Sequence, residues 1–174
     1  MQNISEGKSF LFNSMLSTKK NLRLEEFPAV FQTMLESYHT GNLSLVGACI
    51  IQIKSGEVVN NRVVYDLELL MPIPNNMPIP SSFSYVPRLM IGNCISLRYN
   101  GSYTDLGTQH LKLYQYLQDH NLEAVTGIYH IIEYSEKLEN NADSIFADIC
   151  IGTRKMSVPT VRTYNKTFNQ YSFT

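Results

Sequence analysis

Four carboxylates lie inside otherwise apolar segments, and these residues carry the strongest chemical signal in the chain. Asp66 and Glu68 lie in VVYDLELLM, Glu133 lies in GIYHIIEY, and Asp148 lies in IFADICI. In a strand that is exposed on one side, an alternating charge marks the solvent face. The alternative interpretation is that these carboxylates line a pocket, because burying a charge is costly unless a partner compensates it.

The segment around Asp148 illustrates the second interpretation. Side chains alternate across a sheet, so Phe146 and Asp148 should point to one face, and Ala147, Ile149 and Ile151 to the other. The aliphatic set suits packing under helices. The other face then places an aromatic ring beside a carboxylate, which suits a cationic ligand or an apolar ligand with hydrogen-bonding groups.

Aromatic residues extend this candidate site. The chain has eleven Tyr and eight Phe but no Trp, and tyrosine supplies a flat apolar ring with a polar hydroxyl. Aromatic residues also fill protein cores, so their number alone does not define a site. Tyr129 shares a strand face with Glu133. The candidate ligand-binding residues are Tyr103, Tyr129, Glu133, Phe146 and Asp148, with Tyr65 and Glu68 as their counterparts in the first half.

Other kinds of active site have little support in the sequence. There is no nucleophile motif, phosphate-binding loop, dinucleotide glycine pattern or metal-ligand spacing. We therefore predict no catalytic residue, no metal and no cofactor. The predicted helix at 105–120 is expected to be capped by Thr104 or Asp105 and to carry Leu106, His110, Leu113, Tyr114 and Leu117 on its apolar face. His110 in this position is typical of a core histidine. The three cysteines lie far apart in apolar runs, so we expect small buried hydrophobes rather than disulfides or a zinc site.

The elements that would position these residues occur twice. The expected first unit spans about 8–71 and consists of a strand, a helix and two strands with a turn at Ser55-Gly56 between them, at 8–16, 24–39, 45–54 and 62–71. The stretch 72–82 is rich in proline. It predicts an extended linker, with a polyproline-type ligand as the alternative.

The same order returns in a second unit at about 83–153, with a strand, a helix and two strands at 85–100, 105–120, 126–134 and 145–153. Gly47 and Gly127 are expected to open corresponding strands. The tail 154–174 adds an edge strand or stays mobile. We thus predict a single α+β domain over 1–174, in which duplicated β-α-β-β units form a pseudo-symmetric antiparallel sheet with one helix each.

The second unit resembles the GyrI-like (gyrase-inhibitor-like) effector-binding family. The stretch ISLRYNGSYTDLGTQHLKLYQYLQDHNLEAVTGIYHIIEYSE, followed by SIFADICIG, is similar to that family, and Gly101-Ser102-Tyr103 stands where the family has Gly-Pro-Tyr. The resemblance implies a bacterial protein whose two units enclose a ligand groove. Such domains occur in multidrug-sensing transcription activators, in the gyrase inhibitor and in some hydrolytic relatives. Asp148 occupies the position nearest to the pocket glutamate of the family.

The composition of the chain limits the kinds of binding partner that we expect. Fourteen Lys and Arg against fifteen Asp and Glu give a net charge of −1, so we expect no binding to nucleic acid or to acidic membranes. No secretory signal or bilayer-spanning apolar run is present, which predicts a cytoplasmic protein. No DNA-binding motif precedes the domain, so a stand-alone form is expected.

The leading hypothesis is non-enzymatic binding of a small amphipathic or cationic ligand in a groove between the two units, as in an effector sensor. The alternative is a protein-interaction module for a toxin, gyrase or secretion partner. The third hypothesis is a hydrolase, which would need a carboxylate with a raised pKa in a closed pocket.

Overall fold

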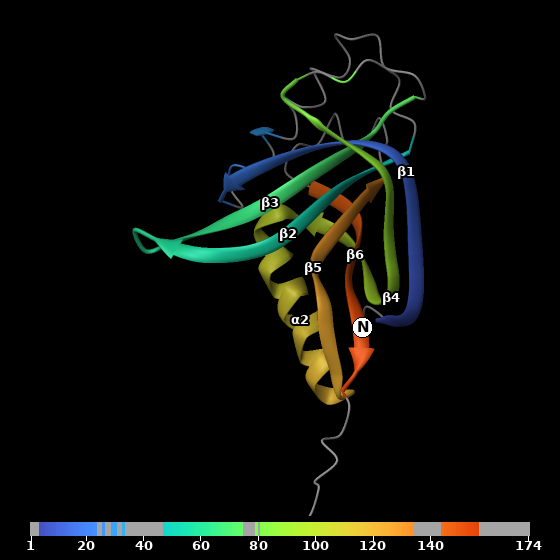
Figure 1. Ribbon diagram of the computed structural model, residues 1–174. Coiled ribbons are helices and arrows are strands. Elements are labelled where there is room, and N and C mark those ends of the chain that lie inside the picture. Colours follow the sequence, from blue (N-terminus) through green and yellow to red (C-terminus); the bar gives the residue numbers. More distant parts are fainter. Residues whose placement is uncertain are drawn as a thin grey trace, which may run out of the picture.

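The computed structural model describes residues 4–23, 26, 29–30, 33, 47–74, 79, 81–133 and 144–156. Six long strands and one α-helix dominate this part of the chain, which confirms the α+β class (Figure 1). In chain order, the elements are β1 (Ser5–Leu22), β2 (Ala48–Val59), β3 (Arg62–Pro72), β4 (Ser84–Ser102), the 3-10 turn η2 (Tyr103–Asp105), α2 (Leu106–Asp119), β5 (Leu122–Glu133) and β6 (Ser144–Lys155).

The sheet topology carries the expected duplication. All neighbouring strands are antiparallel and close into a barrel in the order β1-β3-β2-β5-β6-β4. The first unit contributes β1-β3-β2, and the second contributes the equivalent order β4-β6-β5. The units meet twice, where β2 pairs with β5 and where β1 pairs with β4. Each junction joins equivalent strands, as an approximate twofold axis requires.

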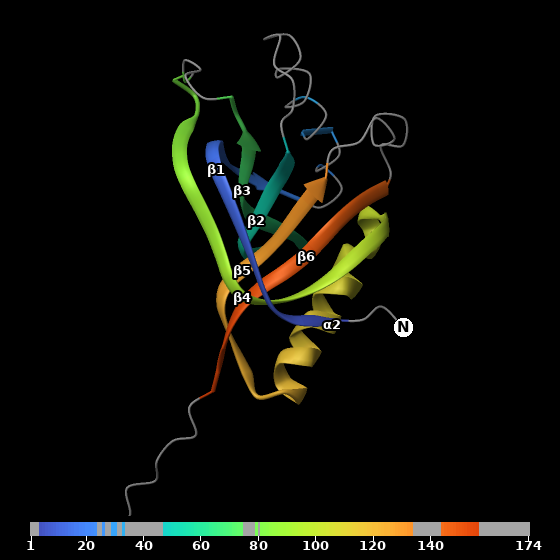
Figure 2. The same ribbon diagram turned by 90° about the vertical axis from the view of Figure 1, so that its right-hand side faces the viewer.

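The alternation of side chains divides the core into two parts. The larger cluster includes Leu106, Leu113 and Leu117 of α2, and it covers one face of the sheet. Helix α2 contacts β4, β5 and β6 on the outside of the barrel (Figure 1, Figure 2). The second cluster contains no helix residue and takes side chains from all six strands: Met15, Ile50, Leu70, Ile91, Cys94, Tyr129, Ile131 and Cys150. It therefore fills the barrel interior.

The turn between the second and third strands is not where the sequence predicted it. Strand β2 does not turn at Ser55-Gly56 but continues to Val59, and the reversal occurs at Asn60-Asn61. Both asparagines have positive φ, 51° and 61°, a conformation that asparagine tolerates better than most residues. Gly56 instead lies opposite Tyr65, whose ring passes over it. An added Cβ at Gly56 would lie 3.1 Å from that ring.

The second helix is close to its prediction. Leu106, His110, Leu113 and Leu117 are buried as expected, but Tyr114 is 46% exposed and does not belong to the apolar face. Asp105 occupies the N-cap position without a side-chain hydrogen bond to the helix, so the expected Asp105 cap is incomplete.

Gly127 does not open a strand, because β5 begins at Leu122. The register of β5 against β6 shifts between Ala124 and Ile128, so Gly127 lies in a β-bulge. The bulge brings it close to β2, where an added Cβ would lie 2.1 Å from the Ile53 carbonyl oxygen. Only glycine fits this point of the junction between the units.

Some predictions fall mostly outside the described residues. Ala29, Val30 and Thr33 are helical, but most of the expected helix at 24–39 is not described. The same holds for the middle of the linker, for 134–143 and for 157–174. Strand β6 extends through Arg154 and Lys155, slightly beyond the predicted end of the second unit.

Candidate ligand-binding site

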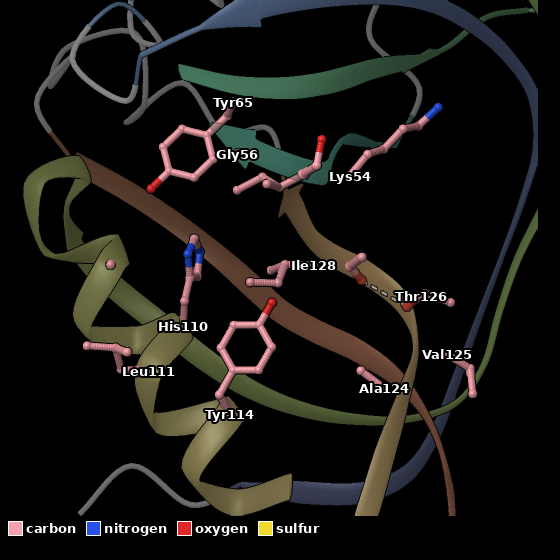
Figure 3. Close-up of a pocket in the computed structure, with 14 residues that line it drawn as sticks. Lys54, Gly56, Tyr65, His110, Leu111, Tyr114, Ala124, Val125, Thr126 and Ile128 are labelled. Carbon is pink, nitrogen blue, oxygen red and sulfur yellow. Dashed lines mark hydrogen bonds between the residues drawn. The ribbon is translucent and has the colours of Figure 1, made fainter. Parts of the chain in front are cut away.

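A cavity of about 700 Å³ lies between the two units, on the helix side of the sheet. We call it the inter-unit cavity. The first unit contributes part of β2 together with Tyr65 of β3, and the second unit contributes one face of α2 and the bulged part of β5 (Figure 3). Its lining residues are Ile53, Lys54, Ser55, Gly56, Tyr65, Gly107, His110, Leu111, Tyr114, Ala124, Val125, Thr126, Gly127 and Ile128.

Local features of β5 shape one wall of this cavity. Residues 125–127 have no register partner on β6, since the pairing resumes only at Ile128. The Thr126 hydroxyl compensates for part of this loss, because it accepts a hydrogen bond of 2.8 Å from the Gly152 N–H. The wall is therefore a stabilised bulge rather than a loose loop.

Three ring side chains with polar atoms face the cavity. Tyr65 approaches from the sheet, and His110 and Tyr114 approach from α2, with Ile128 between them (Figure 3). None of the lining residues is a carboxylate. Lys54 contributes to the rim, but its ammonium pairs with Glu68 and points away from the rings (Figure 3).

His110 is held in place by a second histidine. Its Nε2 lies 2.8 Å from Nε2 of His130 in β5, and the two rings are stacked with centroids 5.0 Å apart. Burial lowers the pKa of His110 to about 4. Burial also lowers the pKa of His130 well below its ordinary value, and the charge of His110 adds to this effect. Both histidine rings are therefore uncharged at neutral pH.

The predicted site residues divide between the two faces of the sheet. Tyr65 lines the inter-unit cavity. Tyr103 belongs to the larger core cluster, where burial raises its pKa to about 12. Glu68, Tyr129 and Asp148 lie on the face of the barrel interior, as the alternation of β3, β5 and β6 requires.

Glu68 and Tyr129 belong to a polar row across the interior face. Gln52 is the cross-strand neighbour of both, and its amide donates a 2.8 Å hydrogen bond to the Tyr129 hydroxyl. Burial raises the pKa of Glu68, but hydrogen bonds from Lys54 and Ser17 outweigh it and leave the pKa below its ordinary value. Glu68 is thus an ionised and partnered carboxylate.

Asp148 and Phe146 lie next to each other on β6. Asp148 is 8% exposed, and its Oδ2 lies 3.7 Å from the Arg98 guanidinium. Its Oδ1 lies 4.0 Å from the Lys8 ammonium but accepts no hydrogen bond from the described residues. The Arg98 guanidinium also lies over the Phe146 ring, 4.7 Å from its centroid. Arg98 therefore takes the position over the aromatic ring that the sequence suggested for a cationic ligand.

Glu133 is the last residue of β5 and pairs with Ala48 of β2. Its side chain lies outside the described part of the structure. Sequence reasoning did not identify His110 or Tyr114 as site residues, because both fall in a helix whose pattern indicates packing. The one available signal was Tyr114, a polar-tipped aromatic placed where the helical pattern meets its exposed side.

Other site types find no support in the described part of the chain. It contains no group of three or more His, Cys, Asp or Glu that could hold a metal ion. No described helix has both the length and the apolar character for a bilayer crossing. All three cysteines are free and buried, which confirms their interpretation as packing residues.

Comparison with known proteins places the fold. No family model matches the chain, and a search of curated proteins finds no match either. Among solved structures, the C-terminal domain of EcmrR is similar, with a TM-score of 0.65 and 12% identity over 90% of this chain and 99% of that domain. This chain shares the fold of that domain. The architecture is consistent with the GyrI-like fold that the second unit resembles.

Two further structures agree. EcmrR in a DNA complex gives a TM-score of 0.66 at 11% identity over 90% of this chain, which spans 58% of the EcmrR chain. A Listeria innocua protein described as a hydrolase gives a TM-score of 0.50 at 11% identity, with 87% of this chain and 91% of that chain covered. At these identities the similarity shows the fold and not the function.

Proposed function

We propose that the chain binds a small amphipathic molecule with an aromatic part in the inter-unit cavity, without catalysing a reaction. The observation that carries the proposal is the cavity of about 700 Å³ in which Tyr65 from one unit meets His110 and Tyr114 from the other. Ligand sites are commonly concave, mostly apolar and lined by a few convergent polar groups. This cavity has those properties.

The lining also narrows the ligand class. Tyrosine and histidine rings provide apolar area and hydrogen bonds, while the lining contains no carboxylate to pair with a cation. An amphipathic ligand without a required positive charge therefore suits the inter-unit cavity better than an obligate cation. The interior carboxylates Asp148 and Glu68 already have basic neighbours.

The competing location is the barrel interior, with Glu68, Tyr129, Phe146 and Asp148 as its residues. The unbonded Oδ1 of Asp148 favours it, because a buried carboxylate oxygen usually accepts a hydrogen bond. A ligand ammonium or hydroxyl would supply one. The two locations predict different mutational effects, so one experiment separates them.

The experiment is a fluorescence titration with three aromatic probes of similar size, one neutral, one cationic and one anionic. Tyr114→Ala should weaken the neutral probe about tenfold by removing ring contacts. The matched control is Tyr85→Ala, because Tyr85 is also 46% exposed but lies on β4, away from the cavity. Equal affinity of the wild type and Tyr114→Ala would contradict the proposal. Selective loss of the cationic probe in Asp148→Asn would place the ligand in the barrel interior.

A protein-binding role is the second candidate, and one surface favours it. The hairpin of β2 and β3 projects from the barrel (Figure 1), and its cross-strand pair Val58 and Val63 is 74% and 43% exposed. In the described residues, β2 has no partner on its other edge beyond Ile53, and such an edge can pair with a second copy of this chain. Sedimentation velocity should then show dimers that Val58→Ser weakens. A concentration-independent monomer would exclude this role.

A further inference from the structure

The histidine pair at the wall of the inter-unit cavity determines which hydrogen-bonding group the cavity offers. His130 is 1% exposed, and His110 is 7% exposed and lines the cavity. Their Nε2 atoms, 2.8 Å apart, are within hydrogen-bond distance. A hydrogen bond between two neutral imidazoles needs one protonated and one bare nitrogen. The pair therefore has two arrangements, which differ in the direction of this bond.

The surroundings keep both rings neutral. His130 pairs with Ile51 on β2 and with Ile149 on β6, so its strand neighbours are aliphatic. The titratable groups that line the adjoining cavity are Tyr65, Tyr114 and Lys54. None of these carries a negative charge that would stabilise an imidazolium, and burial lowers the pKa of both histidines.

The remaining nitrogen of His130 selects between the arrangements. His130 Nδ1 is buried and has no hydrogen-bond partner among the described residues. If His110 donated the shared bond, His130 would carry its proton on Nδ1 as an orphaned buried N–H group, which is rare and costly in proteins. If His130 donates through Nε2, its Nδ1 is only a bare acceptor. The second arrangement is favoured, because a buried bare nitrogen without a donor costs less free energy than a buried N–H group without an acceptor.

This choice sets the state of His110. Its Nε2 accepts the bond from His130, so its own proton must lie on Nδ1. The His110 ring enters the space between Tyr65 and Tyr114 (Figure 3), and Nδ1 is the nitrogen left for a ligand. His130 thereby acts as a positioning residue that fixes the tautomer of its neighbour.

We infer that His110 presents an N–H donor to the inter-unit cavity, and that the cavity selects amphipathic aromatic molecules bearing a hydrogen-bond acceptor, such as a carbonyl, beside the ring. This inference rests on the proposed function and deepens it. The two tyrosine hydroxyls can donate or accept and so do not discriminate, whereas a neutral His110 with Nε2 engaged can only donate. His110 is accordingly the specificity-determining residue.

The tautomers can be observed directly. In protein labelled with ¹⁵N-histidine at pH 7.5, the ring nitrogens should report a proton on Nδ1 of His110 and on Nε2 of His130. The single variants His110→Phe and His130→Phe assign the signals. A proton on Nε2 of His110 would overturn the inference, whatever the ligand experiments show.

Ligand selection is tested with two probes of nearly identical shape, 2-acetylnaphthalene and 2-isopropenylnaphthalene, in which a methylene replaces the carbonyl oxygen. The wild type should bind the ketone about fivefold more tightly, the value of one neutral hydrogen bond. His110→Phe should reduce this ratio to about one, and His130→Phe should reduce it partly because the tautomer is no longer selected. Tyr85→Ala should keep the full ratio.

A failure of the proposed function and a failure of the donor role of His110 would give different results in these titrations. If neither probe binds, the proposed function is wrong and the inference falls with it. If both bind the wild type equally but Tyr114→Ala weakens both, the cavity is a ligand site and only the donor role of His110 is wrong.

Discussion

The barrel interior and the inter-unit cavity lie on opposite faces of the same strands, and they differ in the charged side chains that they contain. The interior face carries the carboxylates Glu68 and Asp148, which have basic groups close by, and Glu68 also lines a separate pocket of about 430 Å³. The cavity has open volume but no carboxylate in its lining. Glu68 and Asp148 thus mark carboxylates that already have basic partners, whereas the inter-unit cavity has no carboxylate in its described lining.

The largest expected effect concerns the contact that creates the cavity. Gly127→Ala would place a Cβ 2.1 Å from the Ile53 carbonyl oxygen and force β2 and β5 apart. We expect a loss of about 3 kcal/mol in the free energy of unfolding, the upper range for overpacking. Urea unfolding measures it. A variant as stable as the wild type would show that the two units meet less closely than described.

The second prediction concerns the pH dependence of stability that His110, on the cavity side of the sheet, should produce. The pKa of His110 falls from its ordinary value of 6.5 to about 4 on folding, so the unfolded chain binds more protons between these values. The contribution of His110 to stability should therefore be fully present above pH 6.5 and should decrease by about 3 kcal/mol as the pH falls to 4. Urea unfolding across this range should show a shallower slope in His110→Gln. An unchanged slope would mean that His110 is not buried.

The third prediction tests whether the ligand binds in the inter-unit cavity or in the barrel interior. Asp148→Asn and Phe146→Leu should leave the affinity for a neutral aromatic probe within about twofold of the wild type, because neither residue lines the inter-unit cavity. Fluorescence titration of each variant with the neutral probe measures these affinities. A loss of tenfold in either variant, with Tyr114→Ala unaffected, would place the ligand site in the barrel interior.

The smallest change in stability is expected at Gly107, another glycine that lines the inter-unit cavity. Gly107 lies in α2, and an added Cβ there would meet nothing within 4 Å. Gly107→Ala should therefore raise the free energy of unfolding by about 0.5–1 kcal/mol through helix propensity. It is the matched control for Gly127→Ala. Destabilisation would indicate that the cavity is narrower at Gly107 than described.

The sequence predicted the parts of the fold that depend on a local repeat. Alternation correctly separated Phe146 and Asp148 from Ala147 and Ile149, and the helical period identified Leu113 and Leu117 as buried. The turn at Ser55-Gly56 was wrong, because Gly56 accommodates the Tyr65 ring in the middle of a long strand.

The site was harder to predict, because the cavity arises from a relation between elements distant in sequence. Its volume depends on the bulge before Ile128, on the contact of Gly127 with β2 and on the position of α2. None of these leaves a periodic signal. The pairing of His110 with His130 likewise joins a helix to a strand twenty residues later. Sequence reasoning expected a groove between the two units, but of the residues it assigned to that groove only Tyr65 lines the inter-unit cavity.

The pairing of β1 with both β3 and β4 has a consequence for how the protein forms during synthesis. Met15 to Leu22 can pair with β3 as soon as the first unit has left the ribosome, but Ser5 to Asn13 must wait for β4, some eighty residues later. During that interval, the waiting segment is an unpaired edge that carries Phe10 and Phe12. At about 5–20 residues per second, the delay lasts several seconds. Aggregation of nascent chains should therefore depend on this segment, and on how quickly β4 arrives to pair with it.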